Sequence, residues 1–387
     1  MAKHAKRDGR LRRAVISAGI VLLLAIVALA AVEYVRTQST GDGALPHDHG
    51  TKSSQPAVKS TLSGARCPLS GESAPGGQVP KRPALAVEVD NYPTARPQRG
   101  IQNADIVFEQ PVESFITRWA VVFQCHQSSL VGDIRSARYM DFGILSQLSD
   151  PIYAHAGAII PDENALAASN RLINVDVLSG SYSNLINHLP GLYAPYDTFA
   201  STSALWGLYP NDKTPPKPLF SYSNAVPNGL PATQVHDPIS SYADIRWQYD
   251  TKTKQYLLSY SGTPAMLANG SQISAANVVV QFVHVYSGPY VEDAEGAFGV
   301  RAHFLGSGPL LVFRNGIEIK GTWKRSSETS TTQLLSSGGS TIKLQPGLTW
   351  VDITPSTVNV TAGVAGVGSS FQGSSQGSSQ GATPSSS

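Results

Sequence analysis

The sequence predicts an α+β protein in which an N-terminal α/β layered domain precedes an all-β domain, barrel- or sandwich-like, with a transmembrane helix before both. Nineteen uncharged residues, 14–32, are long enough to cross a bilayer core. Residues 81–237 alternate strand-like runs with helical patterns, which indicates an α/β layer structure. Residues 238–356 carry strand-like runs and hairpin turns almost exclusively.

The first 35 residues predict the location of the protein. Residues 1–13 form a basic arm with six of the 29 Lys and Arg residues and one acid, and 14–35 form the signal-anchor helix. The positive-inside bias places the N-terminus in the cytoplasm and the main domains outside a plasma membrane. The alternative is a secreted protein, because Ala28-Leu29-Ala30 fits a signal-peptidase site.

Two flanking segments lack apolar periodicity. Residues 36–80 are rich in Ser, Gly, Pro and Thr and predict a flexible stalk, and 357–387 predict a disordered Gly/Ser/Gln tail. Without the basic arm the chain is slightly acidic, which excludes a broad nucleic-acid-binding face.

The chain has two cysteines, Cys67 and Cys125. Outside the cytoplasm two thiols are expected to form a disulfide, here closing a loop of nearly sixty residues. The alternative is two buried free thiols.

The α/β domain is predicted from short apolar runs and two kinds of helix signal. Its expected strands are 84–89, 105–108, 118–125 and 151–156. Its expected helices are 139–148, one that begins at Pro161, and 201–208.

In the β-rich domain, Asn-Gly pairs at 269–270 and 315–316 predict type I′ hairpin turns. The further strands expected there are 277–286, 310–313, 341–344 and 349–353.

Polar residues follow several of the predicted strands. Asp90, Glu109 and His155 lie at predicted strand ends, where ligands bind in α/β sheets. They are the candidate catalytic residues, with carboxylate pairs suited to glycoside hydrolysis. Asp90, Glu109, Asp141 and His155 lack metal-ligand spacing, so no metal is predicted. The sequence has no glycine-rich phosphate loop, G-x-S-x-G or HExxH motif, and we predict no cofactor.

Arg135-Ser136-Ala137-Arg138 precedes the predicted helix 139–148. Ser136 as its N-cap and two arginines beside it would suit a phosphate or carboxylate ligand. The alternative is that both arginines form ion pairs with nearby acids inside the fold. The aromatic segment 192–199 could stack on sugars or peptides, or simply pack as a Pro-rich loop.

Several motifs occur in an order that resembles the YerB-like family of bacterial envelope proteins. They are Cys67-Pro68-Leu69, ALAVEVDNYPTARPQRGIQNADIVFEQPVESFITRWAVVFQC, VGDIRSARYMDFGILSQ, AHAG at 154–157, APYDTF at 194–199, NVVV at 277–280, GSGPLLVFRNGIEIKGTWKR and LQPGLTWVDITP. The resemblance covers about 67–355 and implies a two-domain envelope protein of unknown function. The APYDT form resembles an actinobacterial branch, in agreement with the presence of both cysteines. The chain lacks the lipobox of family lipoproteins, so a transmembrane helix would replace the lipid.

The resemblance and the residue chemistry select the same polar positions as candidate binding residues. They are Asp90, Asn91, Arg96, Glu109, Glu113, Thr117, Arg118, Arg135, Ser136, Arg138 and His155.

The first hypothesis for function is a non-enzymatic, membrane-tethered module that binds an anionic envelope component, such as a cell-wall polymer or peptide stem, at Arg135 and Arg138. The second is an envelope glycan hydrolase or transferase that uses acidic residues. The third is a non-catalytic scaffold that binds envelope proteins.

Overall fold

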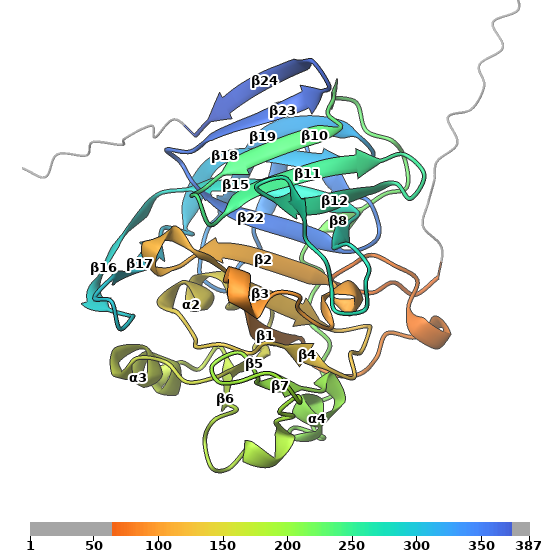
Figure 1. The fold of residues 1–387 in the computed structure, drawn as a ribbon. Helices are drawn as coiled ribbons and strands as arrows, with labels where there is room; N and C mark the ends of the chain where they lie inside the picture. The colour runs from red at the N-terminus through yellow and green to blue at the C-terminus, as the bar shows by residue number, and fades with distance from the viewer. Residues whose placement is uncertain (1–63, 374–387) are drawn as a thin grey trace, which may run out of the picture. The chain divides into compact units, whose positions relative to one another are not determined.

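The computed structural model describes residues 64–373, which are rich in β-structure (Figure 1). The predicted basic arm, the transmembrane helix 14–35 and most of the predicted stalk lie outside the described residues. Within residues 64–373 no helix is both long enough and apolar enough to span a membrane.

The central element is an 11-stranded mixed sheet to which both halves of the chain contribute. From one edge to the other its strands are β20 (Gln333–Ser336), β19 (Ile317–Arg325), β18 (Gly306–Arg314), β15 (Asn277–Val283), β22 (Thr349–Pro355), β2 (Ile106–Pro111), β3 (Thr117–Phe123), β1 (Leu85–Asp90), β5 (Ile152–His155) and β6 (Ile173–Asp176), with β9 (Leu230–Pro231) beside β19. The junction between the halves is the parallel pairing of β2 with β22, in register from Ile106 opposite Thr349 to Glu109 opposite Asp352.

The β-rich region contains two packed sheets, as a sandwich-like domain would, but this junction makes one of them continuous with the N-terminal sheet. Five of its strands extend the N-terminal sheet, and a second, 7-stranded sheet covers them. That sheet consists of β13 (Thr263–Pro264), β12 (Gln255–Tyr260), β11 (Asp244–Asp250), β10 (Gln234–Pro238), β23 (Asn359–Val364) and β24 (Val367–Gln372), with β14 (Ser274–Ala275) beside β12. In the upper part of Figure 1 its strands β10, β11 and β12 overlap β19, β18 and β15 of the larger sheet.

The core between the two sheets contains three tryptophans. Trp350 of β22 lies edge-on to Trp119 of β3, with ring centroids 5.1 Å apart, and to Trp247 of β11, at 5.4 Å. All three are buried. Because one ring contacts residues from both sheets and both halves of the chain, this cluster ties the sheets together.

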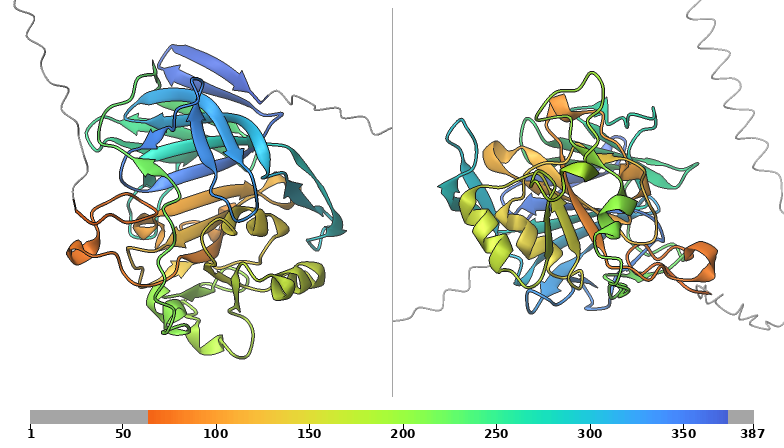
Figure 2. Two further views of the ribbon diagram at one scale, coloured as in Figure 1. Left: turned by 180° about the vertical axis from the view of Figure 1, so that it is seen from behind. Right: turned by 90° about the horizontal axis from the view of Figure 1, so that it is seen from below.

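Three short helices lie around the N-terminal part of the large sheet, in the lower part of Figure 1 and facing the viewer in the right panel of Figure 2. They are α2 (Tyr139–Leu145), α3 (Ile160–Ala168) and α4 (Thr202–Gly207), close to the predicted positions. Met140 and Ile144 of α2 and Leu166 of α3 pack on the sheet face turned away from the second sheet. Small two-stranded sheets complete the fold: β16 (Val285–Val291) with β17 (Phe298–Ala302), β21 (Lys343–Leu344) with β8 (Ser221–Tyr222), and β4 (Val131–Gly132) with β7 (Phe199–Ala200).

Both predicted flanks are shorter than expected. Leu69 and Cys67 are buried, so residues 64–80 belong to the folded body and not to a flexible stalk. The segment 359–372 forms β23 and β24, which corrects the start of the disordered tail, because Val360 and Ala362 pack into the inter-sheet core.

The two Asn-Gly turns differ. Asn315 and Gly316 both have positive φ and join β18 to β19, as a type I′ hairpin requires. At the other pair only Gly270 has positive φ, and the strands on either side, β13 and β14, pair with β12. The type I′ prediction is therefore wrong at Asn269.

Candidate functional site

The first polar cluster lies between the two sheets and is centred on Glu109. The Glu109 carboxylate accepts hydrogen bonds from Thr117 Oγ1 at 2.6 Å, Tyr260 OH at 2.9 Å and Trp350 Nε1 at 3.0 Å. Asn91 Nδ2 donates to it at 3.1 Å. The predicted residues Asn91, Glu109 and Thr117 are thus brought together.

Glu109 is nevertheless inaccessible, which corrects its expected position at a strand end. It lies within β2, and its side chain is completely buried. Burial raises its pKa, although the hydrogen bonds it accepts from Thr117, Tyr260 and Trp350 oppose the shift. With its oxygens occupied by internal donors from both sheets, Glu109 links the two sheets.

Arg96 closes one side of this cluster. Its Nε donates to Asn91 Oδ1 at 3.1 Å, and its guanidinium lies 3.9 Å from the centroid of the Tyr260 ring. The contact is a cation–π interaction between the loop after β1 and strand β12 of the second sheet. Arg96 therefore helps to join the two halves of the chain.

A second cluster joins the loop after β2 to the start of α2. Arg138 Nε donates to Glu113 Oε2 at 2.8 Å and lies 2.8 Å from Glu292 Oε2. Arg118 Nη2 lies 3.8 Å from Glu113. Burial opposes ionisation of Glu113, but the hydrogen bonds from Arg138 and the charges of Arg118 and Arg138 outweigh it and lower its pKa to about 2.

This cluster corrects two expectations about the segment 135–138. Arg138 is buried and its charge is used internally, so it is not open to an external anion. Ser136 is not the N-cap of α2, because the helix begins after Arg138 and the Asp141 carboxylate accepts the Arg138 N–H at 2.6 Å. The Ser136 carbonyl instead accepts a hydrogen bond from Arg118 Nη1 at 2.8 Å.

Arg135 is the partly exposed arginine of that segment. Its N–H donates to the Glu88 carbonyl, which holds the loop along β1, and its Nε donates to Asp90 Oδ2 at 2.8 Å. Its side chain is 26% exposed, and the guanidinium lies 5.7 Å from the Tyr196 ring centroid. Within residues 64–373 no hydrogen bond involves its two terminal amino groups.

His155 lies apart from the other two catalytic candidates. It is buried at the end of β5, with Nε2 2.6 Å from Asn174 Oδ1 and Nδ1 3.0 Å from the Gly157 carbonyl. In the described part of the chain no hydrogen bond or ion pair joins it to Asp90 or Glu109. The expected constellation of Asp90, Glu109 and His155 is therefore not linked through His155 by hydrogen bonds or ion pairs in residues 64–373.

The sequence reasoning missed a buried group of four polar side chains between the large sheet and α2. Gln110 Nε2 donates to Glu88 Oε1 at 3.1 Å and also to the carboxylate of Asp141, which accepts the Tyr153 hydroxyl as well. Burial raises the pKa of Asp141, and burial together with the charge of Asp141 raises that of Glu88. A signal was present in the sequence, because Glu88 interrupts an otherwise apolar buried strand.

The sequence reasoning also missed a hollow of about 560 Å³ between α2, α3 and the segment that joins β17 to β18. Its apolar wall includes Tyr139, Met140, Phe142, Ala165, Leu172, Phe304 and Leu305. Its polar wall includes Arg171, His303, Arg325 and Glu328.

Arg325 is the unusual group in this hollow. It is 2% exposed and donates to the carbonyls of Ser327, Gly143 and Glu328 and to Ser146 Oγ. Within the described chain no carboxylate pairs with Arg325, because that of Glu328 pairs with Arg171. Burial, followed by the charge of Arg171, lowers the pKa of Arg325 to about 10. The hollow therefore carries two nearby positive charges against one negative charge.

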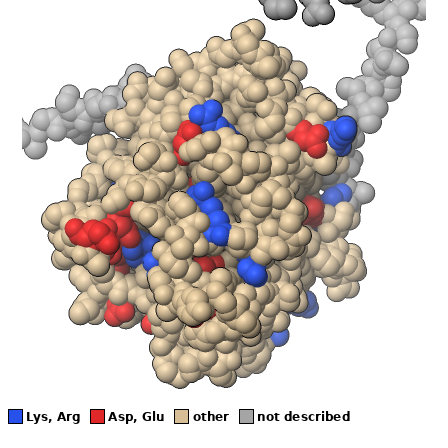
Figure 3. Space-filling view, in the orientation of Figure 1, with Lys and Arg blue, Asp and Glu red and all other residues tan. Residues whose placement is uncertain are grey.

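Charged side chains on the face drawn in Figure 3 form small separate groups of both signs. The described residues define a class of protein: two packed β-sheets shared by both halves of the chain, with internal polar clusters and a partly apolar hollow beside α2 and α3.

Comparison with known proteins assigns this class to a family. Residues 69–214 match the N-terminal domain, and 235–351 the C-terminal domain, of "Protein of unknown function (DUF3048)". The chain belongs to this family, as the resemblance to YerB-like proteins predicts. It is 27% identical over 310 residues to "Putative lipoprotein YerB" of Bacillus subtilis (strain 168), covering 77% of this chain and 89% of that protein. The crystal structure of YerB from Bacillus subtilis has the same fold, with a TM-score of 0.64 and 23% identity over 76% of this chain and 99% of the other.

Proposed function

We propose that this protein is a membrane-anchored extracytoplasmic binding module whose ligand is an anionic, partly apolar component of the cell envelope. The segment 14–35, with its uncharged run 14–32, would be the anchor, and the signal-cleaved secreted form is the alternative. The name of the Bacillus relative, a lipoprotein, supports an envelope location.

The observation that carries the proposal is the hollow beside α2 and α3. Its volume of about 560 Å³ is within the range of small-molecule sites, and its wall combines aromatic rings with polar and charged groups. Arg325 and Arg171 give it positive potential in surroundings where burial weakens screening. A phosphate- or carboxylate-bearing ligand with an apolar part would satisfy both features.

Arg135 is the rival location, because its terminal amino groups lie beside Tyr196 and are free of internal hydrogen bonds. Arg138, its expected partner, is occupied by Glu113 and Glu292. A single guanidinium on an exposed loop offers less binding free energy than a lined hollow. We therefore place the ligand in the hollow.

Titration calorimetry on the purified full-length protein tests the location. The probes are dihexanoyl-phosphatidylglycerol, with dihexanoyl-phosphatidylcholine as the neutral-headgroup comparison. Ala165→Trp fills the hollow without removing a packing group, Arg171→Gln removes a charge, and Arg135→Gln is the matched control. The anionic lipid is expected to bind at least tenfold more weakly to the first two variants and unchanged to the third.

Two results would refute the proposal. One is an unchanged affinity in Ala165→Trp together with a loss in Arg135→Gln, and the other is no saturable binding of the anionic probe. Peptidoglycan stem peptide titrated in parallel distinguishes a wall ligand from a lipid.

A second candidate function is a scaffold for another envelope protein. The β16–β17 hairpin exposes Tyr286, Tyr290, Val291 and Phe298, each more than 40% accessible. Exposed aromatic residues of this kind favour protein contacts. Photo-crosslinking from position 290 in native membranes that captured no envelope protein would argue against a scaffold.

The glycan hydrolase or transferase gains no support from the geometry. Glu109 is buried among four donors, and Asp90 accepts from Arg135 and from the Tyr92 N–H. Neither carboxylate faces a second one across an open cleft, as glycoside hydrolysis requires.

A further inference from the structure

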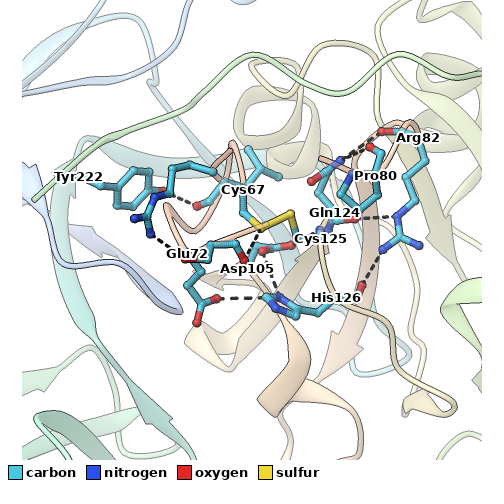
Figure 4. Close-up of a disulfide and its surroundings, with 12 residues drawn as sticks. Cys67, Glu72, Pro80, Arg82, Asp105, Gln124, Cys125, His126 and Tyr222 are labelled. Carbon is cyan, nitrogen blue, oxygen red and sulfur yellow. Dashed lines mark hydrogen bonds and ion pairs between the residues drawn. A yellow bond between two sulfur atoms is a disulfide. The ribbon is translucent and has the colours of Figure 1, made fainter. Parts of the chain in front are cut away.

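A second group of potential ligands lies beside the disulfide, far from the hollow in sequence and independent of the function proposed for it. Glu72, Asp105 and His126 point toward one another around the Cys67–Cys125 bond (Figure 4). Their three ligand atoms all lie within 4.8 Å of one another. They come from three separate stretches of chain, so only the fold brings them together.

The disulfide positions two of the three residues. Cys67 N–H donates to the Glu72 carbonyl at 2.9 Å, which closes a tight loop and presents the Glu72 side chain. His126 directly follows Cys125 at the other end of the bond. The Tyr222 hydroxyl donates to the Leu69 carbonyl and holds the same loop from the opposite side.

The spacing between the groups fits metal ligands better than hydrogen-bond partners. His126 Nδ1 lies 3.6 Å from Asp105 Oδ1 and 3.9 Å from Glu72 Oε2. Both distances exceed hydrogen-bond length. Ligand atoms bound at about 2.1 Å around a tetrahedral zinc ion are about 3.4 Å apart. His126 Nδ1 is within about half an ångström of that spacing from both carboxylates, and the two carboxylate oxygens lie within 4.8 Å of each other.

Asp105 supplies the second, independent observation. It is completely buried, and its Oδ2 accepts the N–H groups of Gln124 at 2.5 Å and Cys125 at 3.1 Å. Its Oδ1 is also buried yet has no hydrogen-bond partner, and it faces the gap toward His126. Buried polar atoms in folded proteins are normally hydrogen-bonded. A buried oxygen that contacts His126 Nδ1 only at ion-pair distance therefore leaves a place for a bound ion.

A hollow of about 360 Å³ adjoins the cluster and is lined by Glu72, His126, Gln102, Asn103 and Gln272 among others. It leaves room for water at an open coordination position, as in zinc sites with three protein ligands. An imidazole combined with carboxylates favours a transition metal over Ca²⁺ or Mg²⁺, which prefer ligands that are all oxygen.

We propose that Glu72, Asp105 and His126 form a zinc-type divalent metal site in which the fourth position faces this hollow. The ion would cross-link the segment before β1 to the residues that flank β2 and β3, parallel to the disulfide. It would therefore stabilise the fold in addition to holding a water or a ligand group.

The test uses tag-free, oxidised full-length protein treated with EDTA and then dialysed. His47 and His49, which flank Asp48 in the predicted stalk, could also hold a metal ion, so both are replaced by Gln in every protein compared. Zinc affinity is measured by competition with a chromophoric chelator, and thermal unfolding is followed with ZnCl₂, CaCl₂ or MgCl₂. The variants are Glu72→Gln and His126→Gln, both at partly exposed positions where the fold should persist.

His188→Gln is the matched control, because His188 Nδ1 also contacts a carboxylate, Asp197, at 3.0 Å, but lacks a third ligand. We expect one zinc per chain, a rise in melting temperature with zinc that calcium and magnesium do not reproduce, and at least tenfold weaker binding in both site variants. His188→Gln should bind like its parent. The absence of saturable one-to-one binding, or undiminished affinity in both site variants, would overturn the proposal.

Discussion

The buried carboxyl group of Asp237 should make the stability of the fold depend on pH. Asp237 lies in β10, completely buried between the sheets, where Thr354 Oγ1 donates to its Oδ2 at 2.5 Å. Its Oδ1 has no hydrogen-bond partner. Burial raises the pKa of Asp237 to about 7, with the charge of Glu109 adding to the shift and the Thr354 bond opposing it.

The raised pKa has a definite consequence for stability. An acid with a folded-state pKa above its unfolded value stabilises the fold most below about pH 4, and this stability is lost as pH rises through about 7. At about 1.4 kcal/mol per pKa unit, a shift of about three units amounts to about 4 kcal/mol in total. About 3 kcal/mol of it falls between pH 5 and pH 8 by the same linkage relation.

Asp237→Asn should remove this part of the pH dependence, because the amide stays neutral. Urea unfolding followed by tryptophan fluorescence at pH 5 and pH 8 measures the change. The loss of unfolding free energy between these pH values should be about 3 kcal/mol smaller in the variant than in the wild type. Thr354→Val is the companion variant. It removes a donor that favours the ionised form, so its loss of stability should extend to higher pH.

An equal pH 5 to pH 8 difference in Asp237→Asn and the wild type would refute the reasoning. So would a flatter profile in Thr354→Val. Either result would mean that water reaches the carboxyl group between the sheets.

Two further predictions concern the disulfide and Glu113. Replacing Cys67 and Cys125 by Ser should lower the free energy of unfolding by about 4 kcal/mol, because the bond closes a loop across 58 positions; equal urea midpoints for the variant and the oxidised wild type would contradict this. Glu113, whose pKa is about 2, contributes stability above about pH 4.5 that is lost as pH falls toward 2. Acid titration of Glu113→Gln should show a smaller decline over that interval, and a decline as large as in the wild type would mean that the Arg138 pair forms equally in the unfolded chain.

Local patterns predicted many of the elements. The helix at 139–148, the strands at 84–89 and 349–353 and the turn at 315–316 are close to their observed positions. The cysteine pairing is confirmed as a disulfide. The helix, strands and turn depend on residues that are neighbours in the sequence. The disulfide was expected from the number of cysteines and from the extracytoplasmic location that the N-terminal segment predicts.

The candidate site could be predicted only in part. Asn91, Glu109 and Thr117 do cluster, since β1, β2 and β3 are neighbours in both sequence and space. Their burial could not be inferred, because the residues that cover them, Tyr260 and Trp350, come from distant parts of the chain.

Sequence by itself determined the order of strands and helices, the pairing of the cysteines and the family. Only the tertiary structure decided that β22 lies beside β2, so that strands from both predicted domains form one sheet. The same pairing places Trp350 beside Glu109, whose carboxylate accepts hydrogen bonds inside the core. The tertiary structure also assembled Glu72, Asp105 and His126 around one gap. The physical reason is that pairing between strands more than two hundred residues apart depends on complementary buried surfaces and closed hydrogen bonds, and neither leaves a periodic signal within a single strand.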